Sequence, residues 1–340
     1  MIHGAPKFAH SQRGVALITA ILMVAIATAL AAKMVWDNQL SMRRTQSNIN
    51  METAKEIALS AETAAIAVLK NLGGDVGHSK PELNEFNTQF FGVVTVDEPD
   101  SDEPIEIGQF YGIAVPANSR ININDLVANS VENAAARQQF ERLFAQLSSD
   151  ADIPTELLDS IIDWIDPDIN PYNAGAEDDA YTTLDPAYRT ANDFFVDISE
   201  LRAIGGMTRD LYDFLQPHIT AIPPGWCGNT TGTTPVNLNF ASPQVIAALT
   251  DQPPSFAEAL AEYVVEVPLD KDNFQSELEN QGISTADFVA AEPYISARTD
   301  CFELSVIVTV GSSTLTMYSL IERGGTGDIV SRARAYGLEN

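Results

Sequence analysis

The chain has 340 residues, 45% of them hydrophobic, which is enough to build more than one compact unit. Its 47 acidic residues outnumber the 19 basic ones, and the formal net charge is −28. Binding to nucleic acid or to anionic lipid requires the opposite sign of charge, so both kinds of partner are disfavoured. The sequence contains no HExxH, GxSxG or P-loop pattern, and its four histidines have no metal-ligand spacing. We therefore expect that this chain is not an enzyme.

The first predicted element is an uncharged, apolar run over residues 15–32. Its length is close to the roughly 20 residues that cross a bilayer as a helix. Lys7 and Arg13 precede the run and the acidic bulk follows it, which predicts an internal N-terminus and an external C-terminal part. Cleavage between Gly14 and Val15 would keep this helix in the mature protein; an uncleaved signal anchor is the alternative.

The helix is expected to continue beyond the apolar run. Small and apolar residues recur at steps of three and four, which indicates an amphipathic helix toward Leu69 that Gly73 and Gly74 end. These residues are Ala54, Ile57, Ala58, Ala61, Ala65 and Val68.

Two predicted β-hairpins lie far apart in the sequence. Residues 90–96 and 109–115 form one pair of strands, and residues 302–310 and 315–322 form the other, because all four are rich in β-branched and aromatic residues. The long stretch between the hairpins has mainly helical patterning. A sheet divided in this way indicates a helical insertion in a small domain that contains both helix and sheet.

Two similar phrases predict two helical subdomains within the insertion. ININDL at residues 121–126 and VNLNFAS at residues 236–242 both alternate apolar residues with asparagine before a helical stretch. Residues 199–217 resemble a helix-hairpin-helix unit, which in other proteins can contact phosphates. Because acidic residues surround it here, we expect this unit to serve packing and not DNA binding.

An acidic loop carries the best candidate metal site. Asp166, Asp168 and Asn170 alternate, and Glu177 is at the twelfth place from Asp166, which is the ligand spacing of an EF-hand loop. The sixth place holds Pro171 where an EF-hand has glycine. Many hard oxygen ligands without His or Cys favour Ca²⁺ over Mg²⁺ or Zn²⁺, and a solvated acidic loop is the alternative. Further candidate ligands are Asp163, Asp178 and Asp179.

Cys227 and Cys301 are the two cysteines, and both lie in the part expected outside the membrane. In an oxidising compartment they would form one disulfide that closes a loop of roughly 70 residues, worth about 4 kcal/mol on the chain-entropy model. Two buried free thiols are the alternative. The anchor and the cysteine pair together indicate the bacterial periplasm.

Taken together, these motifs resemble the minor pseudopilin K family of the type II (general) secretion pathway. The segments that carry the resemblance are RGVALITAI, ININDL, IDWIDPD, GAEDDAY, PAYRTANDFF, ISELRAIGGM and VNLNFAS. Most pilin-like subunits have Glu at the fifth mature position, where it pairs with the amino terminus of an adjoining subunit. Here that position is Thr19, and a carboxylate without a partner would be costly in lipid.

The resemblance implies an α+β fold: a pseudopilin antiparallel-sheet domain on an N-terminal transmembrane and amphipathic helix, with a large all-helical insertion of two SAM-like subdomains and calcium held by acidic residues. The expected organisation is a leader at 1–14, the helix at 15–73, the sheet domain at 74–118 and 300–323, the subdomains at 119–222 and 223–299, and a tail at 324–340.

The resemblance also implies partners and a position. The minor pseudopilins I and J would bind this chain at the pseudopilus tip, with H and the major pseudopilin nearby, and secreted exoproteins are further candidates. The prepilin peptidase would cleave between Gly14 and Val15 and methylate the new amine, leaving a single-pass inner-membrane protein with a periplasmic domain. A bulky insertion would obstruct the next subunit, which favours initiation or capping. The alternative is a minor pilin of a type IV pilus or DNA-uptake system.

Overall fold

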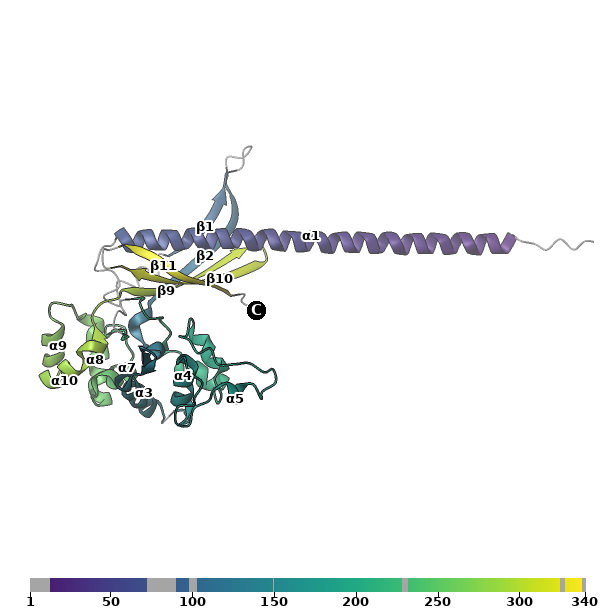
Figure 1. Ribbon diagram of the computed structural model, residues 1–340. Coiled ribbons are helices and arrows are strands. Elements are labelled where there is room, and N and C mark those ends of the chain that lie inside the picture. The colour runs from purple at the N-terminus through teal and green to yellow at the C-terminus, as the bar shows by residue number, and fades with distance from the viewer. Residues whose placement is uncertain are drawn as a thin grey trace, which may run out of the picture.

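The computed structural model describes residues 13–71, 90–97, 103–148, 150–227, 232–324 and 328–337 (Figure 1). Most of the predicted leader and the Gly73-Gly74 helix end lie outside these residues. Within them, one long helix packs on one face of an antiparallel sheet, and a helical insertion lies on the opposite side of that sheet. The insertion is at the end of the molecule away from the start of the helix. The expected α+β class is confirmed.

Helix α1 (Arg13–Asn71) has two different halves. Its N-terminal half projects away from the sheet, and its best 18-residue window has a mean hydropathy of 2.2 with none of its residues buried. Among the described residues it is the one helix long and apolar enough to cross a membrane. The C-terminal half packs on the sheet through Ala54, Ala58, Ala61 and Ala65, whose small side chains allow close approach.

For one of the small and apolar residues listed for the amphipathic helix, the expectation of burial is wrong. Val68 is 39% exposed, and the next residue, Leu69, is buried in its place at 1%. Leu69 lies four residues beyond Ala65 and so shares its face of the helix.

The sheet has the strand order β1-β2-β9-β10-β11, with every neighbouring pair antiparallel. The predicted hairpins correspond to the pairs β1-β2 and β9-β10, and β2 pairs with β9 at the centre. The strands are β1 (Phe91–Val96), β2 (Ile105–Pro116), β9 (Cys301–Val310), β10 (Ser313–Arg323) and β11 (Ile329–Gly337).

The expected tail at 324–340 contains a fifth strand. Strand β11 pairs with β10 and forms an edge of the sheet, so the sheet domain extends past residue 323. Arginines in this strand weaken its hydrophobic pattern, which is common in edge strands. Arg334 pairs with the buried Glu62 of α1 at 2.7 Å, and Ser331 donates to the same carboxylate at 2.8 Å.

The insertion connects β2 to β9 and begins with η2 (Ala117–Ser119). The first subdomain contains β3 (Ile121–Asn122), η3 (Ile123–Leu126), β4 (Val127–Ala128), β5 (Val131–Glu132), α3 (Ala134–Leu147), α4 (Leu157–Ile165), α5 (Asp178–Tyr181), η4 (Ile198–Ala203), α6 (Arg209–Leu215) and β6 (Ile219–Thr220). The second contains β7 (Val236–Asn237), α7 (Pro243–Thr250), α8 (Pro254–Glu266), α9 (Phe274–Asn280), α10 (Thr285–Ala291), η5 (Glu292–Tyr294) and β8 (Ile295–Ser296). One continuous hydrophobic core runs through both subdomains.

The two asparagine phrases have the same structural role. The first strand of each subdomain pairs in parallel with its last strand, β3 with β6 and β7 with β8. Asn124 accepts from the backbone N–H of Phe195 and donates to its carbonyl, and Asn239 makes the same two bonds with Leu269. The sequence similarity between the phrases therefore reflects one repeated framework.

A disulfide and an ion pair link the insertion to strand β9, close to the point where the chain leaves the insertion and enters the sheet. The structure pairs Cys227, in the connection between the subdomains, with Cys301 at the start of β9, at a Cα–Cα distance of 5.2 Å. Arg120 also pairs with Glu303 of β9. Both contacts fix the insertion to the same strand.

Candidate metal site

Helix α4 presents the acidic residues from which the site is built. All nine of its residues are buried, and Asp159 and Asp163 lie four apart on one face of the helix. Asp166 is the residue at which the helix ends, and the chain there turns into the acidic loop. The loop returns toward α4 and leads into α5, with Glu177 as the residue before that helix.

Three of the predicted ligands meet in space. Carboxylate oxygens of Asp166, Asp168 and Glu177 lie within 4.8 Å of one another. Asp168 is exposed, whereas Glu177 is only 3% exposed. The spacing taken from the sequence thus brings together carboxylates from both ends of the loop, although Pro171 replaces the EF-hand glycine.

Three other candidates are used differently. Asn170 donates from its backbone and its side-chain amide to Asp168 Oδ1, at 2.7 and 2.8 Å, and so orients that carboxylate. Asp178 accepts from the backbone and hydroxyl of Thr190 and pairs with Arg189 at 3.4 Å. Asp179 is exposed. Neither Asp178 nor Asp179 belongs to the group of carboxylates that meet among the described residues.

The three carboxylates and the residues next to them, here called the acidic cluster, contain buried side-chain oxygens that receive no hydrogen bond from the described residues. They are Asp163 Oδ2, Asp166 Oδ1, Glu177 Oε1 and Asn192 Oδ1. Buried acceptors are normally paired, and a cation with hard oxygen ligands would supply the missing partner. The residues present therefore fit a calcium ion.

Sequence reasoning missed Asn192. Its side-chain N–H donates to the backbone carbonyl of Asp168 at 3.1 Å. Its side-chain oxygen, Oδ1, takes no part in that hydrogen bond. It has a φ of 48°, a left-handed conformation that asparagine tolerates better than most residues. The only sequence signal was its place in the PAYRTANDFF segment, 24 residues from Asp168.

The electrostatics of the cluster favour a positive charge. Burial, together with the charges of the neighbouring Asp166 and Asp159, raises the pKa of Asp163 to about 6 against the opposing hydrogen bond from the Tyr172 backbone. Burial and the charge of Asp163 raise the pKa of Glu177 to about 7. A divalent cation would relieve this repulsion and favour the ionised carboxylates.

The loop passes so close to α4 that glycine is needed at residue 175. A Cβ atom on Gly175 would lie 2.1 Å from Asp163 Oδ2 and 2.9 Å from the carbonyl oxygen of Asp159. Any side chain at this position would push the loop away from the helix.

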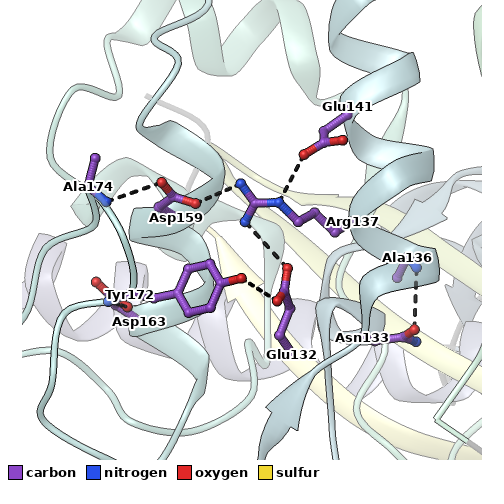
Figure 2. A network of polar contacts seen from close by, with 9 residues as sticks. All are labelled: Glu132, Asn133, Ala136, Arg137, Glu141, Asp159, Asp163, Tyr172 and Ala174. Carbon is purple, nitrogen blue, oxygen red and sulfur yellow. Dashed lines mark hydrogen bonds and ion pairs between the residues drawn. The ribbon is translucent and has the colours of Figure 1, made fainter.

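Arg137 of α3 lies beside the site at the centre of a group of carboxylates (Figure 2). Its guanidinium pairs with Asp159 at 2.8 Å, with Glu141 at 2.9 Å and with Glu132 at 3.5 Å. Sequence reasoning assigned no role to this arginine, because its partners come from three separate elements.

The fold and the site define the chain as a pilin-like subunit: a long apolar helix on an antiparallel sheet, with an added helical insertion that carries an acidic cluster. The family model for type II secretion system protein K matches residues 119–224. Type II secretion system protein K of Pseudomonas aeruginosa PAO1 is 31% identical over 331 residues, which cover 96% of this chain and 93% of the relative. The Klebsiella pneumoniae protein of the same name is 28% identical and covers 97% and 98% of the two chains.

Among solved structures, a chain of the GspK-GspI-GspJ complex of the enterotoxigenic Escherichia coli type 2 secretion system matches with a TM-score of 0.67. The match has 22% identity and covers 87% of this chain and 100% of that one, so it supports the fold. The chain belongs to the type II secretion system protein K family and is a minor pseudopilin of that system. Proteins of this family are structural pseudopilins. Membership of the family does not favour the alternative prediction, a minor pilin of a type IV pilus or DNA-uptake system.

Proposed function

We propose that this minor pseudopilin occupies the tip of the pseudopilus, where it initiates or caps the filament and so supports protein secretion across the outer membrane. The observation that carries the proposal is the position of the insertion, on the other side of the sheet from α1 and away from the start of that helix (Figure 1). A filament grows by head-to-tail addition of subunits, and this mass would obstruct a subunit stacking above. Thr19, at the position where most subunits have Glu, agrees with a subunit that has no upper neighbour.

The minor pseudopilins I and J are the proposed direct partners, because the solved chain of the same fold comes from a complex with GspI and GspJ. H and the major pseudopilin would follow below them in the filament. Secreted exoproteins are proposed to contact the exposed head.

The proposed location is the inner membrane, crossed once by α1, with the C-terminal domain in the periplasm. The apolar part of α1 is continuous with the part that packs on the sheet, so cleavage between Gly14 and Val15 would leave one intact helix. The prepilin peptidase is the proposed processing enzyme and would also methylate the new amine. The pairing of Cys227 with Cys301 agrees with an oxidising compartment.

Calcium is the proposed ion of the acidic cluster. Asp166, Asp168 and Glu177 would hold it, with the unpaired oxygens of Asn192 and Asp163 beside them. When bound, the ion supplies positive charge that joins the end of α4 to the returning loop. Its role here is structural, because it stabilises one conformation of the first subdomain.

The fold suggests a direct test of capping. Pro116 of β2 lies opposite Phe302 of β9 in the antiparallel pair, so a short turn can replace residues 117–300 without a change in register. The shortened chain would also carry Cys301→Ser, because its disulfide partner is removed. In cells that assemble pseudopili, immunogold labelling should place the full chain at one end of each filament and the shortened chain along the shaft. Full-length chain found along the shaft would contradict the proposal.

A second measurement tests the partners. The full chain, purified in detergent with minor pseudopilins I and J, should elute as one discrete complex, and a type IV minor pilin from the same cells serves as the control for non-specific association. Separate elution of the three proteins would contradict the proposed tip complex.

A further inference from the structure

Arg137 occupies a position that its own helix does not favour. It is the fourth residue of α3, whose N-terminal end has the positive end of the helix dipole and no acidic residue in the first turn. A positive charge there weakens the helix. The compensation comes from carboxylates of three elements: Glu132 of β5, Glu141 of α3 and Asp159 of α4.

Through these partners Arg137 reaches the returning segment of the acidic loop. Its guanidinium lies 5.4 Å from the ring centroid of Tyr172, and the Tyr172 hydroxyl donates to Glu132, which is itself paired with Arg137 (Figure 2). Asp159 uses one oxygen for Arg137 and the other to accept from the backbone of Ala174, at 3.3 Å. The loop is therefore held at Tyr172 and at Ala174.

The same segment sets the carboxylates of the candidate metal site. The backbone N–H of Tyr172 donates to Asp163 Oδ1 at 2.7 Å, and Gly175 packs against Asp163 Oδ2. Glu177 follows two residues later and meets Asp166 and Asp168. A shift of the Tyr172–Ala174 backbone would therefore separate Glu177 from the carboxylates at the other end of the loop.

We propose that Arg137 is a positioning residue of this metal site: it neutralises Asp159 and Glu132 and holds the loop so that Asp166, Asp168 and Glu177 converge on a divalent cation. This inference rests on the proposed calcium site. It runs against the simple effect of charge, because removing a nearby positive charge would by itself strengthen cation binding. The direction of the change in affinity therefore separates the two effects.

The test measures calcium binding by isothermal titration of calcium chloride into the full chain in detergent. Arg137→Met should raise the Kd for calcium by about 10- to 100-fold, the usual effect of losing a residue that orients metal ligands. Arg137→Lys keeps the charge but not the planar fork, and should give an intermediate Kd. The matched control is Arg142→Met on the same helix, whose partner Asp251 is exposed and far from the loop in sequence, and its Kd should stay within about twofold of the wild-type value.

An unchanged or lower Kd in a folded Arg137→Met protein would overturn the proposal, even if its Tm falls, since equal destabilisation with and without calcium is what a purely structural arginine would show. If circular dichroism shows that Arg137→Met has less helix than the wild-type chain, the same titration is made with Tyr172→Leu. A Kd for calcium that is unchanged or lower in this variant would then overturn the proposal. A wild-type chain that gives a flat titration would overturn the calcium site itself, which distinguishes that failure from the failure of Arg137 alone.

Discussion

The two helical subdomains have one framework but differ in what lies inside it. In the first, the asparagine that bonds to a distant backbone reaches 71 residues along the chain, from Asn124 to Phe195. In the second, the equivalent bond spans 30 residues, from Asn239 to Leu269. The longer span of the first subdomain contains the acidic loop, Arg137 and its carboxylate partners.

This difference shows two ways of holding a chain in place. The second subdomain relies on apolar helices α7, α8 and α10 packed in the common core. The acidic loop of the first, residues 166–177, has no buried apolar residue, so it depends on hydrogen bonds from its backbone to Asp159 and Asp163 of α4 and, as proposed, on a bound cation. We expect conditions that affect charge to act on the first subdomain and to leave the second unchanged.

The largest expected effect concerns the shared framework. Asn124→Ala and Asn239→Ala should each lower the free energy of unfolding by about 3 kcal/mol, because each leaves a buried backbone N–H and carbonyl without a partner. Urea unfolding of the full chain in detergent checks this. Asn124→Ala alone should also weaken calcium binding, since Phe195 follows shortly after Asn192. Equal loss of calcium binding in both variants would break the comparison.

Calcium removal should act on one subdomain. At a calcium concentration of 100 times the Kd, binding stabilises a fold by about 2.7 kcal/mol, so chelation with EGTA should lower the Tm by roughly 5 to 10 °C. Hydrogen exchange should then quicken in α4 and residues 166–192 and stay constant in residues 236–296. Asp168→Ala should blunt the shift, whereas Asp179→Ala, outside the cluster, should not. No change in Tm on chelation would remove the metal assignment.

pH should distinguish the subdomains in the calcium-free protein. Burial raises the pKa of Asp163 to about 6 and of Glu177 to about 7 in the folded chain, so the folded state binds more protons than the unfolded state between pH 4 and 7. Its stability should therefore fall as pH rises through this window. Hydrogen exchange of α4, corrected for the intrinsic rate, should be faster at pH 8 than at pH 5, with added calcium cancelling the difference. An equal pH effect on α7 would contradict this expectation.

The smallest effect is expected at the contact between the subdomains. Arg142 of α3 pairs with Asp251 at the end of α7 at 2.9 Å, and the two side chains are 35% and 68% exposed. Arg142→Ala should therefore lower the free energy of unfolding by less than about 1 kcal/mol. A larger loss, measured by urea unfolding against Arg209→Ala as an exposed control, would show that the charged contact and not the common core joins the two units.

The sequence predicted those parts of the fold that depend on local patterns. The apolar run of α1, both hairpins and the paired asparagine phrases are periodic or repeated, and the structure contains all of them. Strand β11 was missed because its arginines interrupt the expected alternation, and one of them reaches across to Glu62. That contact is between residues 272 apart in the chain, which no local pattern can indicate.

The candidate site was predictable to a similar degree. Spacing alone selected Asp166, Asp168 and Glu177, which meet in the structure. It also selected Asn170, whose backbone and side-chain amides donate to Asp168 Oδ1, and whose role as a ligand stays a prediction. Asn192 and Arg137 were missed because their contacts to the loop depend on how the chain folds back, and the sequence gives no distance for that.

Helix α1 is unbroken between the end of its apolar run at residue 32 and its first buried contact with the sheet at Ala54. At 1.5 Å per residue these 22 or so positions form a rod of about 33 Å, comparable to the hydrocarbon thickness of a bilayer. Such a rod sets both the height of the head above the membrane and its rotation about the helix axis. Each residue added to it would raise the head by only about 1.5 Å but rotate it by about 100°, so a change in spacer length would alter which way the head faces long before it altered how far the head reaches.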